Sequence, residues 1–214
     1  ELGNLKNPRD VELLTGQAVV GIRREDPYRV VVLADGSELT TYTVIIATGM
    51  SAGMLRVPGI EALQGVGVYY GAAMTEAARY RDRDVCVVGG ANSAGQGALF
   101  FSRYVRKVTM LLRAPDLAPM MSQYLVDRIR ATPNIEVIGN AEVAGVVGEG
   151  QLEAVTIKRR NSDQQQTISL SAMFIFIGVQ PHTGAFAGLV ERDDSDFILT
   201  GVDLPQEHGR PRGW

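Results

Sequence analysis

The stretch from Val85 to Phe100, VCVVGGANSAGQGALF, carries residue types that can bind a dinucleotide. An apolar run typical of a β-strand reaches two glycines and continues into small residues that predict a helix. Gly89 at the strand end permits a tight turn. A helix that begins near Asn92 or Ser93 would direct unpaired backbone N–H groups at a diphosphate, and the Asn92 side chain could cap that helix.

One position of this turn departs from the G-x-G-x-x-A pattern. Ala94 fills the last small position, but Ala91 stands where a second glycine would let the backbone approach the phosphates. The alternative is a strand-to-helix turn of small residues that binds no ligand. Gly95 and Gly97 cost about 1 kcal/mol each relative to alanine, so we expect the helix to pack closely on a sheet. The candidate cofactor-binding residues of the turn are Gly89, Gly90, Ala91, Asn92, Ser93 and Ala94.

The end of the next apolar run decides which nicotinamide nucleotide the turn would prefer. KVTMLL is followed by Arg113, at the position where an NAD site carries an acidic residue. An arginine there favours the 2′-phosphate of NADPH, with NADH as the alternative. Asp116 lies a few residues too late for the ribose role. The alternative for Arg113 is a solvated side chain at a strand end.

Other candidate nucleophiles and ligands are few. Cys86, the single cysteine, lies inside an apolar run and is expected to be a core residue, and an internal disulfide is excluded. His182 and His208 are far apart in the sequence, so no metal cluster is predicted. The net charge of −3 gives no reason to expect nucleic acid, and no apolar run approaches the roughly 18 residues of a membrane helix. We therefore expect a protein of the reducing cytoplasm.

A repeated pattern of strands surrounds the glycine-rich turn. Residues 11–49 and 135–178 each read as a strand, an antiparallel meander and a fully apolar strand that ends in glycine. Fully apolar strands, here VIIAT and MFIFI, are typical of the centre of a parallel sheet. The strand VCVV, a helix over about 93–106 and the strand KVTMLL form one βαβ unit. The predicted fold class is therefore α/β.

Five motifs of the chain resemble those of the low-molecular-weight thioredoxin reductases. They follow the family's order at similar spacing and cover nearly the whole chain. No motif is specific alone, but all five stand in register. The motifs are ATG (47–49), VPG (57–59), GGANSA (89–94), VTMLLR (108–113) and IGVQPHT (177–183).

The resemblance implies two Rossmann-like dinucleotide-binding domains of three-layer ββα architecture, with an NAD(P)H domain inserted in an FAD domain. Residues 1–64 would be the first part of the FAD domain, 65–171 the NAD(P)H domain and 172–214 the second part of the FAD domain. The family's N-terminal glycine-rich FAD loop and C-terminal Gly-Asp motif have no counterpart here. We therefore expect a longer protein that binds FAD and forms a homodimer. The resemblance also assigns Ala47, Thr48, Gly49 and Gly178 to cofactor binding.

The redox-active cysteine pair of the family is absent from the sequence. By its spacing from Gly89, the pair would fall on Ala72 and Thr75. Neither side chain can form the thiolate that attacks a disulfide. Glu76 stands where the family has an acid that protonates the thiolate, but this chain has no thiolate at that site for Glu76 to protonate.

The expected function is that of an FAD-dependent NAD(P)H oxidoreductase without a catalytic side chain in this segment. Hydride would pass from NAD(P)H to FAD and on to an unknown electron acceptor such as a small redox protein, while the protein supplies binding and alignment. Tyr69 and Tyr70 could stack on a flavin or belong to the core. The chain alone is expected to be inactive. The alternatives are a non-catalytic nucleotide-binding or sensing module and a degraded paralogue.

Overall fold

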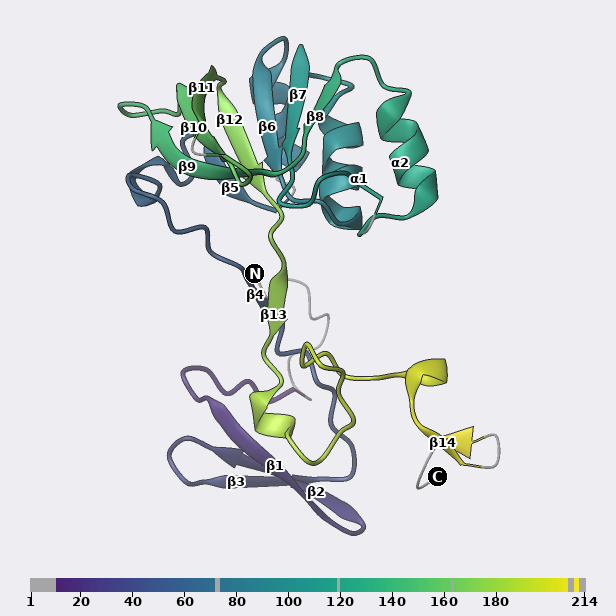
Figure 1. Cartoon of the computed structure of the whole chain (residues 1–214). Coiled ribbons are helices and arrows are strands. Elements are labelled where there is room, and N and C mark those ends of the chain that lie inside the picture. The colour runs from purple at the N-terminus through teal and green to yellow at the C-terminus, as the bar shows by residue number, and fades with distance from the viewer. Residues whose placement is uncertain (1–10, 72–73, 119, 163, 208–209, 212–214) are drawn as a thin grey trace. The chain divides into compact units, whose positions relative to one another are not determined.

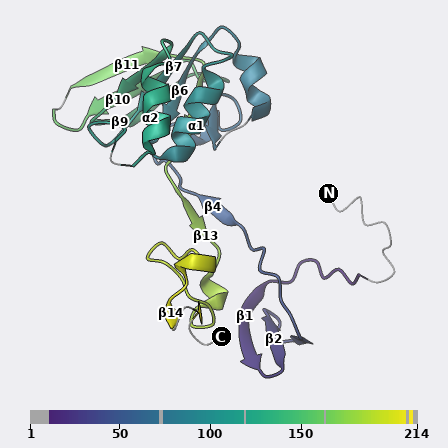
Figure 2. The ribbon, with the colours of Figure 1, turned by 90° about the vertical axis from the view of Figure 1, so that its right-hand side faces the viewer.

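The structure is a computed structural model that describes residues 11–71, 74–118, 120–162, 164–207 and 210–211. The chain divides into two compact units. The first consists of Glu1–Ser51 and Gln180–Trp214, and the second of Ala52–Val179. Figures 1 and 2 show the elements of each unit from two sides. No helix in the described residues is long and apolar enough to cross a membrane.

The second unit is built on a five-stranded parallel sheet. Its order is β5-β12-β6-β7-β8, and every neighbouring pair runs parallel. The apolar run at 172–175 therefore lies inside the sheet, between two neighbours, as its composition predicts. The strands are β5 (Val68–Tyr70), β6 (Asp84–Val88), β7 (Lys107–Leu111), β8 (Ile135–Ile138) and β12 (Ala172–Ile175).

The two faces of this sheet are covered by different layers (Figure 1). Helices α1 (Asn92–Phe101) and α2 (Gln123–Arg130) pack on one face, and the antiparallel meander of β9 (Ala141–Val147), β10 (Ala154–Arg159) and β11 (Gln165–Ser169) packs on the other. Because successive residues of a strand point to opposite faces, Val85 and Val87 face the helices whereas Cys86 and Val88 face the meander. The predicted three-layer α/β architecture is confirmed in this unit.

The predicted βαβ unit is confirmed, with a shorter helix than expected. β6, α1 and β7 follow one another, and the two strands pair in parallel. Helix α1 ends at Phe101 because the next residues turn back toward the start of β6. Arg106 N donates to Arg83 O at 2.9 Å, and the Arg106 guanidinium pairs with Asp84 at 2.8 Å.

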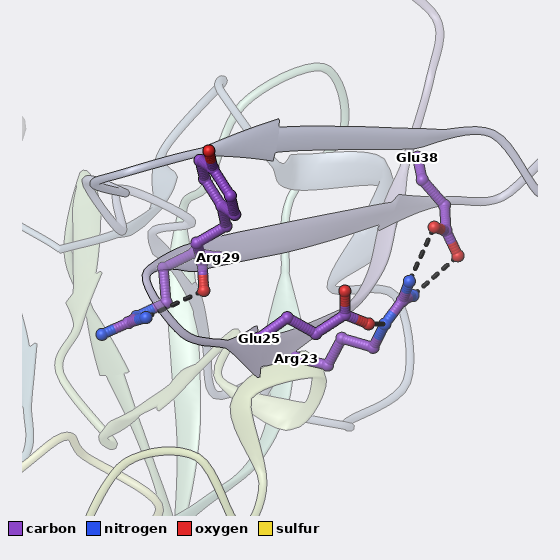
Figure 3. A network of polar contacts seen from close by, with 5 residues as sticks. Arg23, Glu25, Arg29 and Glu38 are labelled. Carbon is purple, nitrogen blue, oxygen red and sulfur yellow. Dashed lines mark hydrogen bonds and ion pairs between the residues drawn. The ribbon is translucent and has the colours of Figure 1, made fainter.

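The first unit contains a three-stranded antiparallel meander of β1 (Val19–Glu25), β2 (Tyr28–Leu33) and β3 (Glu38–Thr41). Its exposed face carries a polar network in which Arg23 donates to both oxygens of Glu38 at 2.6 and 2.7 Å and to Glu25 at 2.6 Å (Figure 3). The guanidinium of Arg23 lowers the pKa of Glu38. Since all three side chains are exposed, these ion pairs add little to stability.

Two strands predicted in the first unit do not form. Residues 11–14 and 43–49 have no strand structure, and Ile45 is 93% exposed. An apolar strand needs hydrogen-bonded neighbours on its edges, and in the described residues no strand pairs with residues 43–49, whose contacts to His182 involve only Thr48 and Gly49. The parallel sheet expected in this unit is therefore absent from the described residues.

The remaining elements are short. The chain passes between the units through β4 (Met50–Ala52) and β13 (Val179–Pro181), which form a two-stranded sheet. The expected divisions after residues 64 and 171 both fall inside the second unit. β12, expected in the FAD domain, lies in the five-stranded sheet because its backbone pairs with β5 and β6. The other elements are η2 (Glu61–Leu63), η3 (Met74–Tyr80), η4 (Gly184–Phe186), η5 (Gly201–Asp203), β14 (Gln206–Glu207) and β15 (Arg210–Pro211).

Candidate functional site

The turn after β6 is so tight that only glycine fits at its first position. Gly89 has φ +141°, and a Cβ atom there would lie 2.3 Å from the carbonyl oxygen of Phe176. Gly89 N donates to Leu111 O at 3.0 Å, which ties the turn to the end of β7. Gly90 has more space, because a Cβ there would meet only Leu112 Cδ2 at 3.5 Å.

Helix α1 begins directly after this turn with its first N–H groups free of partners inside the helix. Ala91 is the N-cap residue, with φ −92° and ψ 177°, and no side chain caps the helix. The first bond of the helix runs from Gly95 N to Ala91 O at 3.1 Å, so the N–H groups ahead of Gly95 have no helical acceptor. Such N–H groups favour an anion at the helix start. The methyl group of Ala91 is exposed there.

Asn92 does not cap the helix, contrary to the sequence prediction. It is the first helical residue, so its side chain cannot take the N-cap position. Its Oδ1 atom instead accepts a hydrogen bond from Ser122 N at 2.8 Å, just before α2. The next residue of the turn, Ser93, is exposed.

The small residues of α1 are explained by close packing. Ala94 is fully buried, and its Cβ lies 3.2 Å from the position that a Cβ on Gly89 would occupy. A Cβ on Gly97 would lie 2.8 Å from the ring of Phe176, which follows β12, so the predicted packing on the sheet is confirmed for Gly97. Gly95 faces the α2 side, where a Cβ would lie 2.8 Å from Met121 Sδ.

Arg113 lies beyond the end of β7, one strand along the sheet from the turn. Its side chain is exposed and has no hydrogen bond or ion pair with the part of the chain that the structure describes. Leu112 beside it is fully buried in the core. Asp116 is bound by Arg130 at 2.6 Å and by Leu117 N at 2.7 Å. At this strand end the guanidinium group of Arg113 is therefore available to a ligand, whereas the carboxylate of Asp116 is already paired with Arg130.

Cys86 is the core residue that the sequence predicts. It is fully buried in β6, on the sheet face toward the meander, and burial raises the pKa of its thiol. A thiol that stays protonated is neither a nucleophile nor a redox group.

We expect native Cys86 to resist 5,5′-dithiobis(2-nitrobenzoate) at about pH 8 and to react in guanidinium chloride, where the ordinary thiol pKa of about 8.5 applies. Because the folded pKa is raised, the thiol contributes stability below the unfolded pKa. This contribution to the free energy of unfolding falls as the pH rises above about 8.5. A native thiol that reacts as fast as the unfolded one would contradict its burial.

Glu76, the acid that follows the second of the two cysteine positions, lies in a cluster of tyrosines. Ala72 is outside the described residues, and Thr75 is exposed in η3. Glu76 accepts a hydrogen bond of 3.4 Å from the hydroxyl group of Tyr69, whose ring stacks on Phe174 at 5.4 Å. The Tyr69 hydroxyl also lies 2.9 Å from that of Tyr80.

Tyr69 and Tyr70 both pack in the second unit, which supports the core alternative for the pair. Tyr69 packs against the cluster on the helix face of the sheet, and Tyr70 against the cluster on the meander face. The Tyr70 hydroxyl accepts a hydrogen bond from Leu55 N at 3.2 Å.

The residues assigned to the flavin side lie in exposed backbone. In the first unit, Thr48 Oγ1 donates to His182 O at 2.7 Å, and His182 N donates to Gly49 O at 3.0 Å. The His182 ring lies between Thr48 O, 3.0 Å from Nδ1, and Ser51 Oγ, 2.6 Å from Nε2. Since a carbonyl oxygen only accepts, Nδ1 carries the proton, and His182 is a structural tie between the two segments.

The other two residues of that assignment are also exposed. Ala47 precedes Thr48 in the segment that forms no strand. Gly178 lies in the second unit, where its carbonyl accepts from Gly53 N at 2.9 Å. The four assigned residues therefore do not form an enclosed pocket within either unit.

Comparison with known proteins identifies the family. The family described as "Pyridine nucleotide-disulphide oxidoreductase" matches residues 4–206. The chain belongs to this family. Its members include flavoprotein oxidoreductases similar to thioredoxin reductase, which confirms the resemblance found in the sequence.

Two curated members of the family illustrate how much of a relative the chain spans. Thioredoxin reductase of Mycolicibacterium smegmatis is 31% identical over 180 residues, which are 84% of this chain and 57% of the relative. A component of the alkyl hydroperoxide reductase of Staphylococcus aureus (strain NCTC 8325 / PS 47) is 30% identical over 190 residues, 89% of this chain and 37% of the relative. The chain thus spans about half the length of these relatives or less.

Solved structures agree with this membership. Thioredoxin reductase from Streptococcus pyogenes MGAS5005 superposes with a TM-score of 0.74 at 30% identity, over 88% of this chain and 61% of that one. Thioredoxin reductase from Giardia duodenalis has a TM-score of 0.77 at 24% identity, over 90% and 63%, and supports the fold alone.

Sequence reasoning missed one basic side chain of this family member. Arg160, 47 residues after Arg113, places Nη1 3.4 Å from the carbonyl oxygen of Arg113. The signal was the Arg-Arg pair at the end of the run LEAVTIKRR, but only the meander brings that pair to the end of β7.

Proposed function

We propose that this chain carries the pyridine nucleotide site of an FAD-dependent oxidoreductase, in which hydride passes from NADPH, with NADH as the alternative, to FAD. The observation that carries the proposal is the cradle at Gly89, which a single Cβ atom would fill, at the end of β6 and directly before α1. The carboxyl ends of parallel strands are where α/β sheets bind nucleotides.

The residues of the turn would hold the diphosphate through their backbone. The N–H groups ahead of Gly95 have no acceptor in the helix and would donate to phosphate oxygens. Arg113 would pair with a 2′-phosphate, since its guanidinium is exposed. The nucleotide supplies the hydride when bound, and the protein supplies alignment.

Ala47, Thr48, Gly49 and Gly178 would provide part of the FAD contacts. All four are exposed, and the Thr48 hydroxyl already donates to His182 O, so backbone atoms would make these contacts. The described residues do not enclose a flavin, so these four residues would only contact FAD and would take no part in hydride transfer. In this proposal the first compact unit, residues 1–51 and 180–214, belongs to the FAD domain, and the second unit, residues 52–179, is the NAD(P)H domain. These boundaries replace the expected divisions of 1–64 and 172–214 for the FAD domain and 65–171 for the NAD(P)H domain.

The electron acceptor of this enzyme would differ from that named in its relatives. Their names refer to thioredoxin and to alkyl hydroperoxide. The single cysteine of this chain is buried in β6, so no dithiol step is available within these residues. We therefore propose another electron acceptor, such as a small redox protein. We also propose that the whole enzyme is a homodimer and works in a reducing cytoplasm.

Arg113→Ala tests the nucleotide assignment. A charge-assisted hydrogen bond contributes about 1.5–3 kcal/mol, so NADPH affinity should fall by about tenfold or more while NADH affinity changes by less than about twofold. The measurement is a fluorescence titration of wild type and variant with both nucleotides. Arg103→Ala, another exposed arginine, which follows α1, is the matched control and should change neither affinity. Unchanged affinities would show that Arg113 is only solvated, and equal losses for both nucleotides would show that it does not bind the 2′-phosphate.

A further inference from the structure

We propose that Arg160, from the turn after β10, binds the 2′-phosphate of NADPH together with Arg113. The inference rests on the proposed nucleotide site and adds a residue that determines its specificity. Arg113 alone supplies one guanidinium to a group with two negative charges, and the structure brings a second guanidinium to the same strand end.

The order of the sheet places this pair beside the nucleotide turn. β6, β7 and β8 are neighbours and parallel, so their carboxyl ends lie along one edge. Gly89 N donates to Leu111 O at 3.0 Å, and Asn140 N donates to Ala114 O at 2.9 Å. Backbone bonds thus join the ends of the three strands, with Arg113 at the middle one.

Arg160 is held against this edge by its own backbone. β10 ends at Arg159, and Arg160 N donates to Asn140 O at 2.7 Å. The side chain then reaches Arg113, with Nη1 3.4 Å from its carbonyl oxygen. A contact of 3.4 Å with one neutral carbonyl is weak, so most donors of this exposed guanidinium are free for an anion.

The charges around the pair are not balanced. Among the residues that the structure describes, Arg160 forms one ion pair, with Glu142, whose Oε2 lies 3.9 Å from Nε, and both side chains are exposed. Asp116 is bound by Arg130 at 2.6 Å. Arg159 adds a third positive charge but donates to Gly139 O at 3.0 Å.

Among the described residues, this edge of the sheet therefore carries more positive than negative charge. Two guanidinium groups suit the two negative charges of the 2′-phosphate of NADPH. The 2′-hydroxyl of NADH would have no acidic side chain to donate to among these residues. The inferred ligand is a ribose 2′-phosphate.

Arg160→Ala in the whole chain tests the inference, with NADPH and NADH as the probes. We expect NADPH affinity to fall by about tenfold and NADH affinity by less than about twofold. Arg160→Lys, which keeps the charge but loses the planar fork, should fall in between. Arg103→Ala is the control for the loss of an exposed positive charge, and circular dichroism checks that each variant is folded.

The double variant Arg113→Ala/Arg160→Ala measures whether the two side chains share one phosphate. We expect a loss of NADPH affinity that differs from the product of the two single losses, because both arginines contact the same group. If wild type binds both nucleotides and Arg160→Ala leaves their affinity ratio unchanged, the inference is wrong while the nucleotide site stands. If wild type binds neither nucleotide, the proposed function is wrong and the inference with it.

Discussion

Gly89→Ala is expected to destabilise the chain by about 3 kcal/mol and to abolish nucleotide binding. The new Cβ would lie 2.3 Å from the carbonyl oxygen of Phe176, and alanine rarely adopts φ +141°. Relief of the clash requires movement of the turn or of the strand end after β12, and either movement displaces the start of α1. Urea unfolding gives the change in the free energy of unfolding, and an NADPH titration gives the loss of binding.

Gly90→Ala is the matched control for this effect. The same methyl group at the next position would meet only Leu112 Cδ2 at 3.5 Å, an ordinary contact, and Gly90 does not have positive φ. We expect a change in the free energy of unfolding of less than about 1 kcal/mol. Equal destabilisation by the two variants would contradict the close approach at Gly89.

An enzyme that carries this chain, reconstituted with FAD and NADPH, is expected to reduce a quinone but not thioredoxin or a small disulfide. Disulfide reduction proceeds through a thiolate and a mixed disulfide. Ala72 and Thr75 offer no thiol, and the thiol of Cys86 is buried with a raised pKa. The measurement compares NADPH oxidation with the two classes of acceptor in one preparation.

Cys86→Ala controls for the one thiol of the chain without burying a new polar group. We expect this variant to keep the quinone activity of the parent enzyme, because Cys86 only fills space in β6. Rapid disulfide reduction by the variant, at a rate near that of quinone reduction, would contradict the proposed acceptor class.

The second unit follows from local patterns in the sequence. The fully apolar run MFIFI (173–177) predicts a buried parallel strand because it lacks polar alternation, and the strand VCVV (85–88) is predicted as part of a βαβ unit. The glycines of α1 predict close packing because each is costly in a helix without it. The structure confirms the buried strands β12 and β6, and it confirms the packing on the sheet for Gly97, whose Cβ position lies 2.8 Å from the Phe176 ring.

Other features depend on partners that a local pattern does not contain. Residues 43–49 have the composition of a central strand, but composition cannot supply the neighbouring strands, and Ile45 stays exposed. Asn92 suits a helix cap by type, yet its amide binds Ser122, 30 residues away. Arg160 meets Arg113 only through the register of β9 and β10. Tertiary contacts of this kind decide which polar groups remain available for a ligand.

Backbone amide signals of the isotopically labelled chain, followed during titration with NADPH, test most directly whether the turn after β6 binds the nucleotide. We expect saturable changes that are largest for Gly89 to Ala94, with further changes at Arg113, because these groups would contact the diphosphate and the 2′-phosphate. The meander of β1 to β3 in the first unit should be unaffected. Signals that do not change at saturating NADPH, or changes that are largest outside residues 89–94, would contradict the account.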